Sequence, residues 1–209
     1  MTKPRAEENL KRLDARLQRE DEDRWLSSRY APTEARQKLI ALYGFNLELA
    51  KVRTIVSEPG LGAIRFQWWR DAVGEIAEGG TPRKHDVVLA VASVGLKTKM
   101  CLNLIDGHEA AFEANDRGQE PEGLLMRTAT SLLVPAHAWS EHIALLAPAY
   151  AAARRGDDQI VDVVVPKVPS PLRPALAHAV LRFAYAGAKR PGPLRKRVAV
   201  MGAMLSGRV

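Results

Sequence analysis

Polar and charged side chains gather between residues 46 and 70, where arginines stand beside two glutamates. Such a set could bind an anion through its arginines, or move a proton through a carboxylate. The candidate ligand-binding residues are Asn46, Glu48, Arg53, Ser57, Glu58, Arg65, Gln67 and Arg70. Arg53 is the candidate for direct contact with an anionic group, and a structural ion pair with Glu58 or Asp71 is the competing interpretation.

Neither a catalytic residue nor a metal ligand is assigned. A single glutamate among arginines is more often part of a structural ion pair than a catalytic group, which applies to Glu48 and Glu58. His137 and His142 are five residues apart, whereas two histidines that bind one metal from a helix stand three or four apart. Cys101 is the only cysteine, so the sequence offers no thiolate zinc site.

Two helices should hold the candidate residues. The first runs from about Pro32 to Val56, because proline suits a first turn and Ser57-Glu58-Pro59-Gly60 ends the helix. Along it, Asn46, Ala50, Arg53 and Ser57 stand four, three and four residues apart, so they share one face. A cavity lined by this face would be polar and cationic.

The second helix should run from about Leu61 to Ala77 and form an antiparallel hairpin with the first. Leu61, Ile64, Trp68 and Ala72 lie along one face, which is therefore the predicted packing face. Trp68 and Trp69 are expected to serve packing. Arg65 and Arg70 either close a pocket or pair with acidic residues, and pairing is the preferred interpretation.

The rest of the chain also has helical patterns. Asp106-Gly107-His108-Glu109 is expected to cap a helix or form a turn, and Ile160–Val165 to form an extended connector. The further predicted helices span about Pro4–Arg19, Asp86–Ala92, Lys97–Glu113, Pro121–Ala153 with a break near Pro135, Leu172–Ala188, and a last segment ending near Ser206.

Composition indicates an ordinary globular protein. Of 209 residues, 46% are hydrophobic and 26% charged, and no apolar run approaches the roughly 20 residues needed to cross a bilayer. The single cysteine favours a reducing compartment, with the cytoplasm as the default. The net charge is +7, but no nucleic-acid motif accompanies it, so no nucleic-acid partner is expected. The basic group that could touch anionic lipid comprises Lys189, Arg190, Arg195, Lys196 and Arg197.

One block of the chain has a pattern that is typical of a known family. It comprises Tyr43-Gly44-Phe45-Asn46-Leu47-Glu48-Leu49-Ala50, Val52-Arg53, Val56-Ser57-Glu58, Gly62, Ile64-Arg65 and Gln67-Trp68-Trp69-Arg70. Through these residues, and over residues 23–76, the chain resembles the squalene/phytoene synthase family. The resemblance implies an all-α, isoprenoid-synthase-like helical bundle, formed by residues 1–209 as a single domain and shortened in its second half.

The enzymes of that family hold magnesium and a substrate diphosphate through aspartates on facing helices, and this chain departs from that pattern. Aligning Tyr43-Gly44-Phe45 with the family's first motif places Ala50, Lys51 and Thr54 where the aspartates would stand. A methyl, an ammonium and a hydroxyl group do not replace carboxylates as ligands of a hard cation. No second aspartate-rich motif is recognised between Leu132 and Ala188. No cofactor is therefore expected, and magnesium would bind only if prenyl-diphosphate chemistry persists.

The same residues resemble an aspartate-free branch of the family that includes a mitochondrial assembly factor of respiratory complex I. This implies a non-catalytic role in assembling or maturing a respiratory complex, with a complex subunit, an assembly protein or an isoprenoid-like or anionic small ligand as partner. The expected place is the cytoplasm, with peripheral contact to the inner membrane. The alternatives are a prenyl-diphosphate transferase of isoprenoid biosynthesis and an isoprenoid or quinone carrier.

Overall fold

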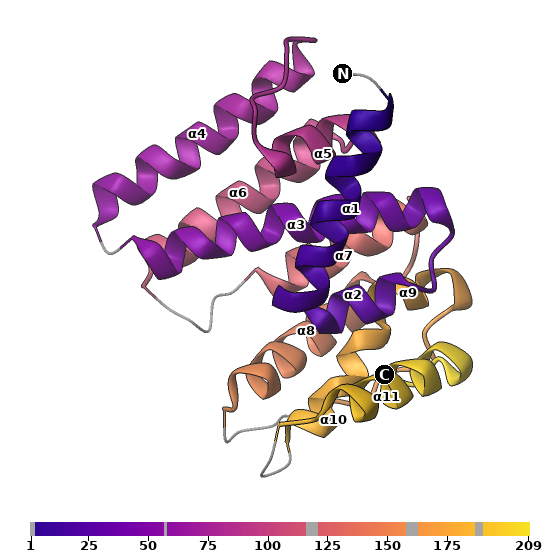
Figure 1. Ribbon diagram of the computed structural model, residues 1–209. Coiled ribbons are helices and arrows are strands. Elements are labelled where there is room, and N and C mark those ends of the chain that lie inside the picture. Colours follow the sequence, from indigo (N-terminus) through magenta and orange to yellow (C-terminus); the bar gives the residue numbers. More distant parts are fainter. Residues whose placement is uncertain (1–2, 57, 116–120, 158–162, 187–189) are drawn as a thin grey trace. The chain divides into compact units, whose positions relative to one another are not determined.

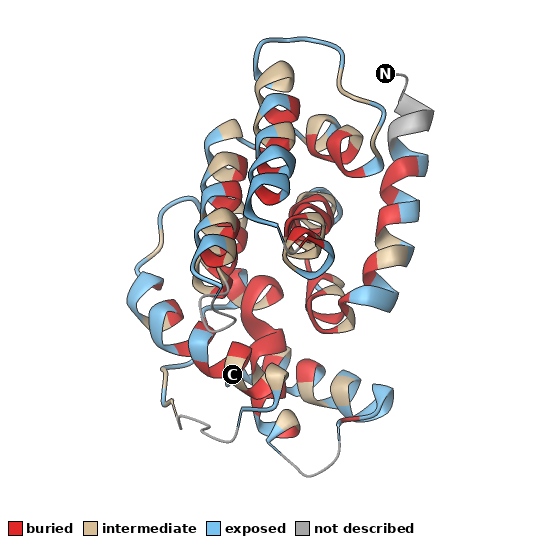
Figure 2. Ribbon diagram, turned by 90° about the vertical axis from the view of Figure 1, so that its left-hand side faces the viewer, coloured by how far each residue is buried: buried red, intermediate tan, exposed pale blue. Residues whose placement is uncertain are grey.

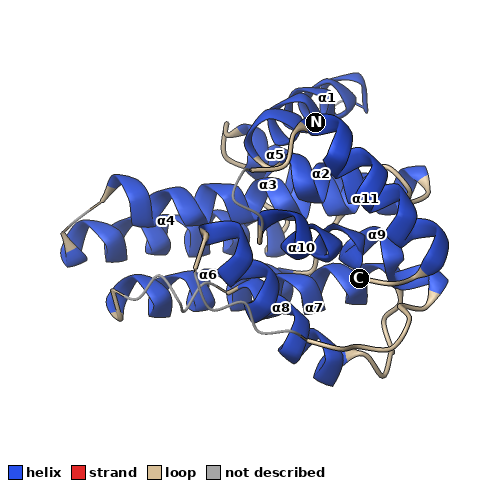
Figure 3. Ribbon diagram, turned by 90° about the horizontal axis from the view of Figure 1, so that it is seen from below, coloured by secondary structure: helices blue, strands red, loops and turns tan. Residues whose placement is uncertain are grey.

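The computed structural model describes residues 3–56, 58–115, 121–157, 163–186 and 190–209. Within these ranges the regular elements are helices and no strand occurs, which confirms the all-α prediction (Figure 3). The elements are α1 (Lys3–Glu20), α2 (Glu22–Ser28), α3 (Thr33–Ile55), α4 (Pro59–Ala77), α5 (Asp86–Val94), α6 (Thr98–Glu113), α7 (Glu122–Leu133), α8 (Ser140–Arg155), α9 (Arg173–Leu176), α10 (Arg182–Tyr185), α11 (Pro193–Ser206), and the 3₁₀ helices η2 (Ser170–Leu172) and η3 (Ala177–Leu181) (Figure 1).

The chain folds into two compact units, and each unit is built from two stretches of sequence. Unit 1 comprises Met1–Glu20 and Gln37–Pro121, and unit 2 comprises Asp21–Arg36 and Glu122–Val209. Unit 1 contains α1, most of α3, and α4 to α6, whereas unit 2 contains α2, the first turn of α3, and the elements from α7 onward. The expectation of a single domain over residues 1–209 stays a prediction.

Two glycines allow the helices of unit 1 to approach closely. A Cβ atom on Gly44 of α3 would lie 2.6 Å from a methyl carbon of Leu13 in α1. A Cβ atom on Gly62 of α4 would lie only 2.1 Å from the Phe112 ring of α6. Since such distances are far below van der Waals contact, the bare backbone is what lets α1 rest on α3 and α6 rest on α4.

The buried face of α4 differs from the predicted one. Leu61 and Ile64 are exposed and Trp68 is only half-buried, although Ala72 is buried as expected. The side that packs in unit 1 carries Gly62, Phe66, Trp69, Ala72 and Val73. The prediction was wrong because α4 has apolar residues on two faces, and close packing against Phe112 selects the face that contains glycine.

Most helix boundaries agree with the sequence patterns to within a few residues, and most helices bury one side and expose the other (Figure 2). α2 was missed, because its seven residues are too few to show a period. The segment Asp106–Glu109 lies inside α6 and forms neither a cap nor a turn. Of the expected connector, residues 160–162 lie outside the described residues, and residues 163–165 are neither helix nor strand.

The helix predicted for Leu172–Ala188 is interrupted. The described part consists of short α segments with a 3₁₀ stretch, η3, between them, and residues 187–188 lie outside the described ranges. η3 packs against α2, α8 and α11, so its surroundings bury it on several sides. At its end, the buried Arg182 guanidinium donates to the carbonyl oxygens of Ala179, Val163 and Val209. Tertiary contacts therefore replace the continuous helical ladder that the sequence suggested. Within the described ranges, no helix is long and apolar enough to cross a membrane.

Candidate functional site

An aromatic cluster supports the part of unit 1 that holds the candidate residues. The ring centroids of Phe45 in α3 and Trp69 in α4 are 5.3 Å apart, with their planes nearly perpendicular. Trp69 also meets Trp68 at 4.9 Å and His85, the residue before α5, at 5.1 Å. Edge-to-face contacts of this kind add to the stabilisation from burial alone. The packing role predicted for the two tryptophans is therefore confirmed for Trp69, which is buried, and partly for the half-buried Trp68.

Asn46 is buried in α3 and meets a buried histidine of α6. Its Oδ1 atom lies 2.9 Å from Nε2 of His108, and a hydrogen bond joins the two side chains. Because a buried amide needs a partner, this bond explains how Asn46 is accommodated in the core. It gives Asn46 a structural contact, and ligand binding by Asn46 stays a prediction.

Glu48 lies beside basic side chains of α1 and α3 and beside His85, the residue before α5. It forms an ion pair with Arg16 of α1, and its carboxylate oxygens lie 3.9 Å from Lys51 Nζ and 3.9 Å from His85 Nε2. Lys51 also pairs with Glu20 at 3.0 Å. Burial is the largest single influence and would lower the pKa of Arg16, but the hydrogen bonds and charges of Glu48 and Glu20 together outweigh it, so the pKa is raised. Glu48 thus has the structural pairing that the sequence favoured over catalysis.

Arg70 of α4 connects to α6 through two carboxylates. Its guanidinium lies 2.6 Å from Asp106 and also pairs with Glu109. The hydrogen bond to Glu109 is the main reason that the pKa of Arg70 is raised. Gln67, one turn earlier, donates to Asp71 at 2.7 Å. Acidic pairing, the preferred interpretation for Arg70, is confirmed.

The remaining candidates lie near the junction of α3 and α4. Arg53 is half-buried in the last turn of α3, Glu58 is the exposed N-cap residue of α4, and Arg65 is exposed on α4. Ser57 lies outside the described residues. The contacts described for Asn46, Glu48, Gln67 and Arg70 are to other side chains and not to each other, so ligand binding by the eight candidates stays a prediction.

Unit 2 contains a buried ion-pair network that the sequence did not predict. Arg24 of α2 pairs with Asp21 and with Glu122 of α7, and Asp21 lies 3.2 Å from Arg154 of α8. Burial alone would raise the pKa of Asp21, but Arg24 and Arg154 outweigh it and the pKa is lowered. Ion pairs removed from water in this way cost several kcal/mol each if a single partner is lost.

Asp23 forms the second centre of this network. One carboxylate oxygen accepts hydrogen bonds from the hydroxyl groups of Tyr150 at 2.9 Å and Tyr185 at 2.6 Å, and the other lies 2.9 Å from Nζ of Lys196. Burial is the largest single influence and would raise the pKa of Asp23, but the bonds from Tyr185 and Lys196 and the charges of Arg154 and Lys196 together outweigh it, so the pKa is lowered. Burial, followed by the bond to Asp23, raises the pKa of Tyr185 to about 12.

His178 of η3 lies against this network in an uncharged form. Its ring meets the Tyr150 ring edge-on at 5.0 Å, and neither ring nitrogen has a hydrogen-bond partner within the described part of the chain. Burial, with a smaller contribution from the Arg24 charge, lowers the pKa of His178 to about 3. The imidazole is therefore neutral at physiological pH.

The sequence offered only a weak signal for this network. Arg19-Glu20-Asp21-Glu22-Asp23-Arg24 is a dense charge run, which usually indicates a solvated surface. The partners stand far along the chain, since Glu122 is 98 residues from Arg24 and Tyr185 is 162 residues from Asp23. Local pattern cannot indicate pairing at such separations.

Comparison with known proteins settles the family. A model of the squalene/phytoene synthase family matches residues 17–125, which is more than half of the chain. The chain belongs to the squalene/phytoene synthase family. The resemblance inferred from residues 23–76 is therefore confirmed. A comparison with solved structures gave no significant match.

Curated relatives within this family carry one name. The Bos taurus protein, named NADH dehydrogenase (ubiquinone) complex I, assembly factor 6, is 31% identical over 122 residues, which make up 56% of this chain and 37% of the relative. The Homo sapiens protein of that name is 30% identical over the same shares, and the Rattus norvegicus protein is 33% identical over 96 residues, 44% of this chain and 29% of the relative. The matched stretch thus spans 37% of the cattle and human relatives and 29% of the rat relative.

For a squalene/phytoene synthase family member, the last two turns of α3 are unusual in charge. At the positions aligned with the enzymes' aspartates, Ala50 is half-buried, Lys51 pairs with Glu20, and the Thr54 hydroxyl donates to the Lys51 carbonyl oxygen at 3.0 Å. Throughout the described ranges, no three or more His, Cys, Asp or Glu side chains are grouped so as to hold a metal ion. The α3 face therefore presents a paired ammonium group where family enzymes present metal-binding carboxylates.

Proposed function

We propose that this protein is a non-catalytic member of the squalene/phytoene synthase family that acts in the assembly or maturation of a respiratory complex. It does so by binding a protein partner, namely a complex subunit or another assembly protein, or an isoprenoid-like or anionic small ligand. As part of the proposal, it works in the cytoplasm in peripheral contact with the inner membrane.

The observation that carries the proposal is the charge of the α3 face. Departure of a diphosphate depends on cations held by carboxylates. Lys51 occupies this face and is engaged by Glu20 at 3.0 Å, and the nearby Glu48 is paired with Arg16. These ion pairs give the face a structural use that competes with metal binding.

The relatives support the direction of the proposal. The cattle and human proteins named as complex I assembly factor 6 match this chain at 31% and 30% identity. The family model matches residues 17–125 of this chain, a range that contains α3 and α4. A chain that shares this region and lacks the enzymes' aspartates is better suited to binding than to prenyl transfer.

The first test measures chemistry directly. The purified protein is incubated with magnesium and either farnesyl or geranylgeranyl diphosphate, and released diphosphate is measured beside an active full-length enzyme of the family. We expect no release from this protein while the control enzyme is active. Release that a chelator abolishes would overturn the proposal in favour of a prenyl-diphosphate transferase.

The second test measures assembly. Cells that lack the gene should contain less fully assembled complex I on native gels, and the wild-type gene should restore it. Normal assembly without the gene would contradict the proposed role, and isoprenoid or quinone lipid extracted from the purified protein would then indicate a carrier. Arg53→Ala tests the candidate ligand contact: a folded variant that binds ligand and partner as the wild type does would exclude Arg53 from binding.

A further inference from the structure

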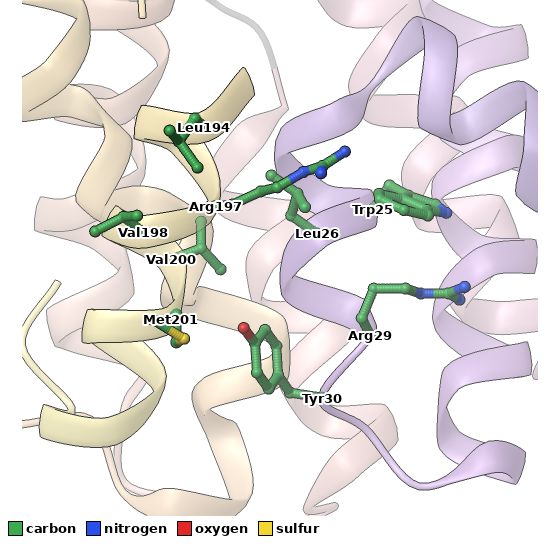
Figure 4. A pocket seen from close by; sticks show the side chains of 9 residues that line it. All are labelled: Trp25, Leu26, Arg29, Tyr30, Leu194, Arg197, Val198, Val200 and Met201. Atoms are coloured by element: carbon green, nitrogen blue, oxygen red, sulfur yellow. The ribbon is translucent and has the colours of Figure 1, made fainter. Parts of the chain in front are cut away.

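α2 and α11 enclose a groove within unit 2 (Figure 4). Its volume is about 510 Å³, which is in the range of recognised binding pockets. Leu26 on α2 and Val198, Val200 and Met201 on α11 contribute apolar surface, and Arg197 contributes charge, whereas the guanidinium of Arg29 lies over the Trp25 ring at 5.0 Å. The groove is therefore mainly apolar and has the cationic group of Arg197 at its edge.

One face of α11 remains uncovered. Leu194, Val198, Met201 and Leu205 stand four, three and four residues apart, so they form one stripe along the helix. Their exposed fractions are 76%, 55%, 46% and 77%. The opposite face packs into unit 2 at Ala203, and Val200, which lines the groove, is buried as well. Four exposed apolar residues in one row along a surface helix are typical of a binding face.

The charges around the groove have one sign. Among the described residues no carboxylate lines it, and α11 contains no acidic residue. The acidic residues of α2 are Glu22 and Asp23. Their carboxylate oxygens lie 3.3 Å and 2.9 Å from Nζ of Lys196, so both have a cationic partner. Arg197 extends from α11 toward α2, as Figure 4 shows. A complementary partner must therefore be acidic.

We propose that the groove between α2 and α11 binds an acidic amphipathic helix of a protein partner. A groove between two helices accepts one row of side chains from a third helix, in the way that ridges of one helix pack into grooves of another. The stripe from Leu194 to Leu205 is about 16 Å long, enough for about three helical turns. Arg197 is placed to meet acidic side chains beside the partner's apolar row.

A membrane surface is a poorer match than a helix. A bilayer rests on protruding side chains, whereas Leu26 and Val200 are buried in the wall of the groove and only an inserted side chain can reach them. The inference rests on the proposed function in that it names the surface and the chemistry of the assembly partner.

The test uses the full chain and synthetic helical peptides. One peptide carries leucines at positions i, i+4 and i+7 with flanking glutamates, a second replaces the glutamates with lysines, and a third has the first composition scrambled. Binding is measured by fluorescence anisotropy. We expect the acidic peptide to bind at least tenfold more tightly than the other two, with affinity that falls as salt rises.

Variants locate the binding site. Val198→Asp should weaken binding of the acidic peptide at least tenfold. Leu145→Asp is the matched control, because Leu145 on α8 has the same 55% exposure as Val198 and does not line the groove. Arg197→Glu should weaken the acidic peptide and strengthen the lysine peptide, a reversal that misfolding cannot produce.

Other outcomes overturn the inference. An equal loss of peptide affinity in Val198→Asp and Leu145→Asp would exclude the groove as the peptide-binding site. Tighter binding to phosphatidylglycerol vesicles than to the acidic peptide, weakened by the same substitutions, would also overturn the inference. The two proposals fail separately. If Arg197→Glu loses peptide binding but restores complex I assembly in cells, the groove has no part in assembly and the proposed function stands. If peptide binding follows the expected pattern but assembly does not need the gene, the proposed function fails and the groove stands.

Discussion

Replacing His178 with phenylalanine should reduce the loss of stability that this protein suffers as the solution becomes mildly acidic. In the folded state the pKa of His178 is about 3, because the ring is buried beside the Arg24 charge. In the unfolded state an ordinary histidine has a pKa of about 6.5. The folded pKa is the lower one, so unfolding takes up a proton at any pH between these values, and stability falls as pH falls below about 6.5.

The magnitude follows from the two pKa values. At about pH 5 the unfolded state gains about 2 kcal/mol from protonating this one histidine, while the folded state gains almost nothing. Phenylalanine fills nearly the same space, can keep the edge-on contact with Tyr150, and removes two ring nitrogens that have no hydrogen-bond partner within the described part of the chain. The variant should therefore fold, and its free energy of unfolding should lack the pH-dependent contribution of His178.

The assay is urea unfolding, followed by circular dichroism, at about pH 7.5 and about pH 5. The wild type should lose about 2 kcal/mol more unfolding free energy than His178→Phe between these conditions. His142→Phe, which replaces a half-buried histidine beside Trp139, is the control and should behave as the wild type. Equal losses in the wild type and His178→Phe would refute the conclusion that His178 is buried in its neutral form.

Two further substitutions test the packing of each unit. Gly62→Ala should destabilise unit 1 by about 1–3 kcal/mol in urea unfolding, because the new methyl group would overlap the Phe112 ring. Gly60→Ala is the control and should be nearly neutral, because a Cβ atom at Gly60 meets open space. Equal effects of the two substitutions would contradict the close approach of Gly62 to Phe112. Glu122→Gln should cost about 3–5 kcal/mol by leaving a buried guanidinium partly uncompensated, whereas the exposed Glu141→Gln should change the melting temperature little. A Glu122→Gln variant as stable as the wild type would mean that the buried pair contributes nothing net.

The helices that hold the candidate site could be predicted from sequence because their ends have local causes. Pro59 disfavours helical geometry in the residue before it and suits the first turn of α4, so no distant residue is needed to explain the break between α3 and α4. The family could be predicted for a similar reason, since the residues that identify it are nearly contiguous. The lack of carboxylates at positions aligned with the enzymes' aspartates also follows directly from the sequence, which has Lys51 and Thr54 there.

The partners of the site residues could not be predicted. Asn46 was expected to line a cavity, but its contact with His108 depends on how α6 packs on α3. The packing face of α4 was misjudged because Ile64 is as apolar as Phe66, and only the position of Phe112 decides between the two faces. Ion pairs between residues that are far apart in the sequence could not be predicted either, because no local sequence pattern indicates them.

The division of the chain into interleaved units imposes an order on its synthesis. Every residue of unit 1 precedes Glu122, so this unit can close while the ribosome is still translating. Asp21–Arg36 must meanwhile loop out as an insertion, with its charges in water. At about 5–20 residues per second, Asp23 waits on the order of ten seconds for Lys196. For that interval the nascent chain holds a finished unit beside a short acidic segment whose permanent neighbours do not yet exist.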